Sequence, residues 1–439
     1  MVRCAVADDS FLNYFASFCK SDLPTIGLIL GQPTPSKYYL IHFARTPSHN
    51  EDTEEQNPVK SFSDISNVWV ADHARHATRM LPGGMYVLGI FVVFSENLFE
   101  VFSLKLKSIL VEINKTLGNN KFLHGVPVEN SDKLILCYSS SNKSFVSKSY
   151  NFESGLISIV DMKFEPHLSV KWLQLECIYE LDQTFPIIAA KENWSFKKHM
   201  NDILKFISTS LKHGIFFFDG EVKDESDCLE SIGKKRKVPQ AKFVQHDTKL
   251  LQVTIILPNE MLLSKSDAEI IDCGGQIRLT GHVATKLWLH PKATIKDASS
   301  AIIEDIERSL ATRLEMHWDS LIEEERGLLE GLNSVHEIPR RVSVNLPVSK
   351  INLYDYLFPG EGPQEAQVSL KELLDIDVSG TNCIFDVESQ ADVMDLHRDT
   401  IKTDTEDILQ TTNKFIYFVG LGIAFIVLII SLLIHKIQN

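Results

Sequence analysis

A run of twenty apolar and small residues near the end of the sequence constrains the fold more than any other feature. Phe415–Ile434 reads FIYFVGLGIAFIVLIISLLI and contains no charged residue, proline, asparagine or glutamine. A helix rises about 1.5 Å per residue, so this run is long enough to cross the roughly 30 Å hydrocarbon core of a membrane. Only five residues follow Ile434, too few to bury the helix in a protein core. The sequence therefore predicts one transmembrane helix from Phe415 to Ile434, in contact with the lipid bilayer.

The position of this span predicts the topology of the chain. The first residues, MVRCAVADD, have no apolar stretch long enough for a signal peptide. A span this close to the C-terminus inserts after translation and leaves the preceding bulk of the chain in the cytosol. We expect a tail-anchored, single-pass protein, with the endoplasmic reticulum as the membrane because the span is strongly hydrophobic.

Charge and cysteine usage fit a cytosolic chain. The net charge of −14 argues against nucleic acid as a partner, because nucleic-acid binding needs a basic face. The basic run Lys234–Lys237 lies beside an acidic stretch and is interpreted as a solvated loop. Seven scattered cysteines form no CxxC pair, which favours reduced thiols over a disulfide framework or a zinc site.

The first part of the chain, residues 1–164, has the pattern of an α/β domain. Apolar runs bounded by turn residues predict strands, and apolar positions at helical spacing predict helices. The predicted strands are Thr25–Gly31, Tyr38–Phe43, Met85–Phe94 and Lys133–Tyr138, and the predicted helices are Asp64–Met80 and Phe99–Leu117. The first two strands are expected to be neighbours.

The second part, residues 168–346, is predicted to be a mixed α+β domain. Its expected elements are a helix at Lys197–Leu211, strands at Gly214–Phe218, Leu250–Leu257, Gly275–Leu279 and His282–Leu289, and a long helix at Asp297–Leu329. An apolar stripe on the long helix favours packing onto the preceding sheet over a coiled coil. Residues 347–414, with their Pro-Gly and polar stretches, are predicted to be a flexible tether to the membrane.

Motifs that carry enzyme chemistry are absent from the sequence. It has no phosphate-binding loop, GxSxG turn or HExxH helix. His73 and His76 lie one helical turn apart, but no further ligand stands nearby, so a packing or surface role is favoured over zinc binding. We predict no catalytic, cofactor-binding or metal-binding residue, and no cofactor.

Two apolar runs read together resemble the framework of an MPN (JAMM) domain. They are GLILG at Gly27–Gly31 and VLGIFVVF at Val87–Phe94. Active MPN domains hold zinc with two histidines and an aspartate, and use a glutamate and a serine beside it. Aligned on Gly89, those histidine positions hold Val92 and Phe94, the glutamate position holds Pro24, and the serine and aspartate positions hold Phe102 and Lys105. Apolar and cationic side chains do not bind Zn²⁺, so the resemblance implies a metal-free MPN-like domain.

A more specific block spans Ala74–Phe91 and reads ARHATRMLPGGMYVLGIF. It resembles the signature of the odorant-response-abnormal protein 4 family, and the GLILG run and the C-terminal span agree with that resemblance. The resemblance implies a non-enzymatic factor at the endoplasmic reticulum that supports maturation and trafficking of membrane receptors. It also implies a heterodimer, through MPN-like domains, with the cysteine protease that acts on the ubiquitin-fold modifier (UFM).

The turn inside this block is our candidate partner-binding site, because it is a loop between two rigid elements. Its residues are Arg79, Met80, Leu81, Pro82, Gly83 and Gly84. The proline and glycines also explain the turn as a plain helix stop, and the sequence leaves both interpretations open.

Two other functions compete with the adaptor. A SNARE-like fusion or tethering protein has a similar layout, but it needs a long heptad helix leading into the span, and residues 387–413 have few apolar positions. An active hydrolase needs either a zinc ligand set elsewhere or a Cys-His pair formed by folding.

Overall fold

The computed structural model describes residues 3–18, 25–47, 61–96, 98–125, 132–166, 172–232, 250–257, 272–325, 337–346, 351–378 and 384–388. Met1–Glu388 form one compact unit. The predicted span Phe415–Ile434 lies outside the described residues. Within the described ranges, no helix is long and apolar enough to cross a membrane. The described unit is a mixed α+β fold, as the sequence predicts, and it contains three sheets.

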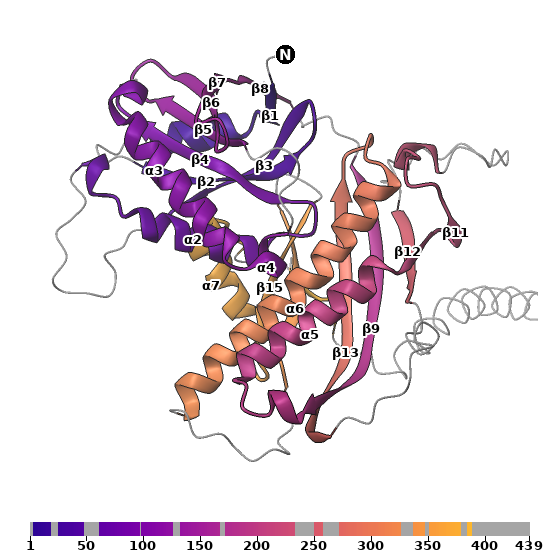
Figure 1. Cartoon of the computed structure of the whole chain (residues 1–439). Helices are drawn as coiled ribbons and strands as arrows, with labels where there is room; N and C mark the ends of the chain where they lie inside the picture. Colours follow the sequence, from indigo (N-terminus) through magenta and orange to yellow (C-terminus); the bar gives the residue numbers. More distant parts are fainter. Residues whose placement is uncertain are drawn as a thin grey trace, which may run out of the picture. The chain divides into compact units, whose positions relative to one another are not determined.

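The largest sheet has eight strands in the order β7-β6-β5-β4-β2-β3-β1-β8 (Figure 1). Its strands are β1 (Cys4–Asp8), β2 (Thr25–Pro33), β3 (Lys37–Arg45), β4 (Tyr86–Phe94), β5 (Asp132–Ser139), β6 (Ser144–Asn151), β7 (Ile157–Ile159) and β8 (Asp161–Glu165). Strand β2 pairs antiparallel with both β3 and β4, which confirms that the first two predicted strands are neighbours.

Helices cover both faces of this sheet. They are α1 (Phe11–Ser17), α2 (Asn67–Arg79), α3 (Phe99–Gly118) and the short α4 (Lys121–His124). Residues of α2 and α3 share one core with one face of β2 and β4, whereas α1 packs in the core of the opposite face. A strand covered on both faces is apolar throughout, which explains the unbroken run in β4. The N-cap of α2 is Ser66 and not Asp64, because Asp64 caps a separate 3₁₀ turn, Phe62–Asp64.

A second sheet has five strands in the order β11-β10-β12-β9-β13. Its elements are β9 (Leu173–Ile188), β10 (Ile215–Phe218), β11 (Glu221–Val222), β12 (Leu250–Ile256), β13 (Cys273–Leu289), and the helices α5 (Phe196–Lys212) and α6 (Ile295–Glu325). Helices α5 and α6 lie side by side across β9 and β13 (Figure 1) and bury the predicted apolar stripe of α6 in the core beneath them. The two strands predicted at Gly275–Leu279 and His282–Leu289 are one strand, because pairing with β9 continues through Gly281.

The predicted tether, residues 347–414, is wrong in its first part. A third sheet of order β15-β14-β16 contains β14 (Arg340–Asn345), β15 (Asn352–Leu357) and β16 (Ile384–Asp386), and α7 (Pro363–Leu374) follows β15. The Pro-Gly stretch that suggested a tether is the turn between β15 and α7. Leu353, Leu370 and Leu374 are fully buried in the main core, so hydrophobic packing orders this region.

Candidate functional site

The positions where the MPN resemblance would place metal ligands are filled by hydrophobic side chains. Val92 on β4 is fully buried. The rings of Phe94 on β4 and Phe102 on α3 stack with their centroids 5.4 Å apart. Phe62 contacts both rings edge-on, at 5.1 and 5.0 Å. We call Phe62, Phe94 and Phe102 the aromatic cluster; its rings offer no nitrogen, oxygen or sulfur donor to a metal.

The remaining members of that alignment add no ligand. Lys105 lies on α3, where burial lowers its pKa and nearby Asp64 opposes the shift. Pro24 lies outside the described residues. Across the described part of the chain, no group of three or more His, Cys, Asp or Glu side chains is placed to hold a metal ion.

His73 and His76 face different surroundings. Burial lowers the pKa of both to about 4, and the neighbouring Arg79 and Arg75 add to the shift of His76. His73 Nε2 donates to Leu373 O at 2.6 Å, and its Nδ1 lies 3.1 Å from the Thr46 hydroxyl. His73 is thus a packing residue that fixes the end of α7.

The turn Arg79–Gly84 connects α2 to β4 and is enclosed by the rest of the chain. Met80 through Gly84 are all buried. Gly83 N donates to Asp305 Oδ1 at 2.8 Å, and Gly84 N donates to Glu304 Oε2 at 3.1 Å. A Cβ atom on Gly83 would lie 1.9 Å from Ala301 O, so α6 packs directly against this backbone. The candidate partner-binding turn is therefore a buried docking point for α6, and a contact with another protein stays a prediction.

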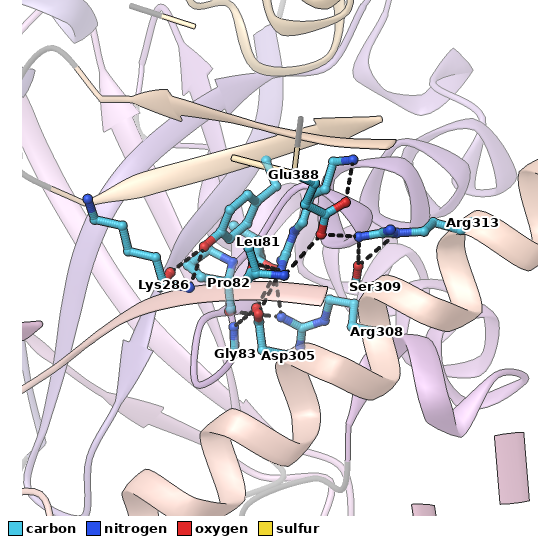
Figure 2. A network of polar contacts seen from close by, with 12 residues as sticks. Leu81, Pro82, Gly83, Lys286, Asp305, Arg308, Ser309, Arg313 and Glu388 are labelled. Carbon is cyan, nitrogen blue, oxygen red and sulfur yellow. Dashed lines mark hydrogen bonds and ion pairs between the residues drawn. The ribbon is translucent and has the colours of Figure 1, made fainter. Parts of the chain in front are cut away.

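Arg308 on α6 binds the other side of this turn. It is completely buried. Its Nη1 donates to Leu81 O and Pro82 O, each at 2.9 Å (Figure 2). Its Nε donates to Leu123 O at 2.9 Å. One guanidinium thus donates to main-chain carbonyls of both the turn and α4 and ties α6 to them.

A second guanidinium joins this network to the third sheet. Arg341 on β14 forms a two-pronged ion pair with Asp305, at 2.7 and 2.9 Å, and both side chains are fully buried. Glu388 accepts from Arg313 Nη2 at 2.5 Å (Figure 2). It also accepts from Arg341 N at 3.0 Å. The network links α6, the turn, β14 and the last described residue of the chain.

Side chains from distant segments complete the outer edge of β13, which among the described strands pairs with β9 alone in its sheet. Gln32 accepts from His290 N and donates to Trp288 O. The Tyr354 hydroxyl accepts from Lys286 N and donates to Lys286 O. Glu388 accepts from Ala284 N. A strand edge exposes unpaired N–H and C=O groups, and here side chains from other parts of the chain satisfy them.

Four residues of this network, Asp305, Arg308, Arg341 and Glu388, are not predicted from the sequence. The only indication was that Asp305 and Arg308 interrupt the apolar side of α6, next to Ile302, Ile306 and Leu310. Charged residues in such a stripe are buried only when partners come from elsewhere in the chain, and those partners are more than thirty positions away.

Comparisons with known proteins place the chain in a family. A family model described as "Odorant response abnormal 4-like" matches residues 27–385. The chain belongs to the ODR4-like family. The matched region runs from β2 to β16, so it contains the buried turn together with Asp305, Arg308 and Arg341.

Several ODR4-like relatives match across most of their length. The "Protein odr-4 homolog" of Mus musculus is 27% identical over 384 residues, covering 86% of this chain and 84% of the relative. The homolog of Pongo abelii is 30% identical over 357 residues, covering 80% and 78%. The "Odorant response abnormal protein 4" of Caenorhabditis elegans is 23% identical over 354 residues, covering 78% and 70%.

Among solved structures, the crystal structure of UfSP from C. elegans is similar with a TM-score of 0.43 and 12% sequence identity. The match covers 85% of this ODR4-like chain and 57% of that chain. The α+β assignment rests on the strand order described above and not on this score.

Proposed function

We propose that this ODR4-like chain is a non-enzymatic adaptor that recruits the UFM-specific cysteine protease to the endoplasmic reticulum membrane. In this proposal its N-terminal part is a metal-free MPN-like domain that pairs with an MPN-like domain of the protease. A helix at Phe415–Ile434 holds the complex on the membrane, with the bulk of the chain in the cytosol. The same protein supports the maturation and trafficking of membrane receptors, in keeping with a family described by an odorant response.

The aromatic cluster is the observation that carries the non-enzymatic part of this proposal. Three phenylalanine rings and Val92 occupy the region where an active MPN domain needs histidine and carboxylate donors. Removing a packed aromatic core of this kind to regain a metal site would leave a cavity. The proposal therefore assigns the domain to binding and not to hydrolysis.

Membrane confinement supplies a physical reason for such an adaptor. A soluble partner that binds an anchored protein gains a higher local concentration near membrane-bound substrates. Confinement of this type raises apparent affinity by orders of magnitude without any new contact. In this mechanism the adaptor contributes no catalytic residue to the protease.

The first test compares the full-length protein with a variant that lacks Phe415–Ile434, in cells where the protease is imaged. We expect the protease at the endoplasmic reticulum with the full-length protein and dispersed in the cytosol with the variant. A control in which an unrelated twenty-residue apolar segment replaces the span restores the membrane location. A protease whose location is the same in all three cell lines contradicts recruitment.

A binding test separates recruitment from anchoring. Residues 1–410, which lack the span, are expected to retain the purified protease in a pull-down. The receptor role is tested in the same cells by the fraction of a membrane receptor that reaches the surface, which we expect to fall when the adaptor is removed. Failure of the soluble piece to bind the protease contradicts the heterodimer but leaves the receptor role to its own test.

The SNARE-like alternative gains no support from the long helix. The apolar side of α6 is buried against the second sheet and its polar residues bind the turn, so this helix has no free heptad surface along its buried length.

A further inference from the structure

Helix α3 has two apolar faces, whereas a helix on the surface of a globular protein normally has one. Its inner face packs into the main core through residues such as Leu106 and Ile109. On the opposite face, Val101, Leu104 and Val111 keep 71%, 80% and 46% of their exposure. These three side chains belong to none of the hydrophobic cores of the described residues, so packing within that part of the chain does not explain them.

The outward face of α3 has the residue spacing of a helix that packs against another helix. Val101, Leu104, Ser108, Val111 and Lys115 follow one another at intervals of three, four, three and four residues. This spacing places them along one line of the helix, and it is the spacing of the contact positions in a coiled coil. We call these five residues the outer stripe.

Helix α2 adds a further apolar side chain near the outer stripe. Asn67 Nδ2 on α2 donates to Ser108 Oγ at 3.1 Å, so the start of α2 lies beside the middle of the outer stripe (Figure 1). The next residue, Val68, keeps 62% of its exposure. An exposed apolar patch of this kind marks a site of contact with another protein or with a membrane.

The charges beside the outer stripe favour a protein over a lipid surface. Glu100, Lys105, Lys107 and Glu112 flank the outer stripe, so acidic and basic side chains alternate along it. A helix that lies on a membrane carries an excess of lysine and arginine next to its apolar face. A mixed polar rim around apolar side chains is instead the pattern of a protein–protein interface.

The apolar residues of the outer stripe are arranged so that it can pack against a second copy of itself. In an antiparallel pair of α3 helices related by a twofold axis at Ser108, Leu104 of each copy lies beside Val111 of the other. The two small Ser108 side chains meet at the axis and allow the helices to approach closely. Twofold symmetry forms each off-axis contact twice, which is typical of homodimers.

The charges match in the same antiparallel arrangement. Lys105 and Glu112 lie two turns apart on one flank of α3, so Lys105 of each copy lies opposite Glu112 of the other. Glu100 likewise comes near Lys115 of the other copy. A parallel pair would instead bring Lys105 of one copy close to Lys107 of the other, which is repulsive. Charge complementarity therefore favours the antiparallel pair.

The present partners of these charged groups do not prevent the exchange. Lys115 pairs with Glu112 at 3.0 Å, and Lys148 pairs with Glu100 at 2.8 Å. The Lys115 and Glu100 side chains keep 68% and 83% of their exposure. Exposed ion pairs of this type contribute little to stability, so these side chains can turn to a new partner at small cost.

We propose that two copies of this chain associate through antiparallel packing of their outer stripes. The occupant of the exposed face of α3 is the same face of a second copy. This association goes beyond the adaptor role and does not depend on it, because it requires neither the protease nor a membrane.

The mass of the purified full-length protein in detergent tests the association. Light scattering during gel filtration, corrected for bound detergent, is expected to give two copies at high protein concentration and one copy on dilution. Leu104→Glu places an unpaired carboxylate in each half of the interface. We expect it to raise the dissociation constant about 10-fold for each of the two copies, or about 100-fold in total.

Val368→Glu is the matched control, because Val368 is an apolar residue on α7 that keeps 55% of its exposure. This variant is expected to associate like the wild type. One copy at every concentration of the wild type overturns the proposal. A dimer that Leu104→Glu leaves intact, or that both variants weaken equally, overturns it as well.

Disulfide crosslinking tests the antiparallel orientation. Ser108→Cys places a thiol at the twofold axis and is expected to crosslink two copies under mild oxidation. Residue 115 is seven positions from the axis, so its two copies lie fourteen positions apart along the helices, or about 21 Å. Lys115→Cys should therefore crosslink no more than the wild type, which measures the background from native thiols such as the exposed Cys273. Crosslinking through residue 115, or none above background through residue 108, overturns the antiparallel pair.

A charge exchange tests the register and the identity of the occupant. Glu112→Lys puts two lysines opposite each other and is expected to weaken the dimer about 10-fold, whereas adding Lys105→Glu restores opposite charges and the dimer. A double variant as weak as Glu112→Lys contradicts the register. If the chain alone stays monomeric and Leu104→Glu abolishes binding of the purified protease, the protease and not a second copy occupies this face.

Discussion

At the scale of single residues, Asp305 is the centre of the buried network. Its carboxylate accepts from Gly83 N and from both terminal nitrogens of Arg341, with no exposure to solvent. Taking two opposite charges out of water is expensive, so a buried ion pair is weak evidence of net stabilisation. Removing only one partner is a different matter, because the other charge then stays buried without compensation.

We expect Asp305→Asn to lower the free energy of unfolding by about 3–5 kcal/mol, because it leaves the Arg341 guanidinium buried and unpaired. Urea denaturation measures this loss. The control Asp182→Asn breaks the exposed pair with Arg278 and is expected to change stability by at most about 1 kcal/mol. Equal losses in the two variants would show that the buried pair has no special role.

The close contact between Gly83 in the turn and α6 leads to a second prediction about a single residue. Gly83→Ala places a methyl group 1.9 Å from Ala301 O, so the turn and α6 must move apart. We expect a loss of about 1–3 kcal/mol, as for other overpacked cores. The control Gly118→Ala, at the end of α3 with no atom within 4 Å of the new methyl, is expected to stabilise the chain by up to about 1 kcal/mol. The measurement is the urea concentration at which half of each variant is unfolded. A Gly83→Ala variant as stable as the wild type would contradict the close packing.

At the scale of elements, α7 is held by two histidines from the N-terminal part. His42 Nε2 donates to Leu374 O and His73 Nε2 donates to Leu373 O, each at 2.6 Å. These are the last carbonyls of α7, which have no partner within the helix. Burial lowers the pKa of both imidazoles, so the folded state keeps them neutral.

The lowered pKa of His73 predicts acid sensitivity. In the unfolded chain this group titrates near 6.5 and in the folded chain near 4, so between these values the unfolded state binds more protons. The stabilisation that comes from keeping His73 neutral is therefore fully present above about pH 6.5. It is lost as the pH decreases towards 4, by about 1.4 kcal/mol per pH unit for one histidine. Between pH 4 and 6.5, His73→Gln should make the free energy of unfolding less steep against pH, by the amount that corresponds to one proton bound on unfolding. Above pH 7 the slope should stay unchanged. An unchanged slope at pH 5–6 would contradict this assignment.

At the scale of the whole molecule, one compact unit continues past residue 346 as far as Glu388. Strand β14 pairs with β15 on one side and β16 on the other, and both follow residue 346 in sequence. Tyr354 and Glu388 also complete the edge of β13. The C-terminal region is therefore part of the fold.

We expect a chain that ends at Glu388 to unfold cooperatively at nearly the temperature of the full-length protein. A chain that ends at Leu346 loses both partners of β14 and exposes the core beneath α7, so we expect it to aggregate or to unfold well below that temperature. Calorimetry and gel filtration of the two chains provide the measurement. Equal stability of both would restore the interpretation of residues 347–388 as a tether.

Much of the architecture follows from local pattern alone. The apolar runs in β2, β3 and β4 and the helical stripes of α2, α3 and α6 predict these elements because periodicity reports which face of a segment is buried. The side chains of Val92, Phe94 and Phe102 contain no atom that can bind zinc, so their identity alone rules them out as ligands in any fold. The block Ala74–Phe91 indicates the ODR4-like family through its residues alone.

Tertiary structure alone decided which surfaces these segments bury. The turn at Gly83 has the local pattern of an exposed loop, and it is buried only because α6 arrives from more than two hundred residues away. Asn352–Leu357 and Ile384–Asp386 lie in the predicted tether, yet pairing with β14 makes them strands. Sequence periodicity specifies that a face is buried but not by what. The identity of the partner depends on contacts between distant segments, which leave no local pattern to read.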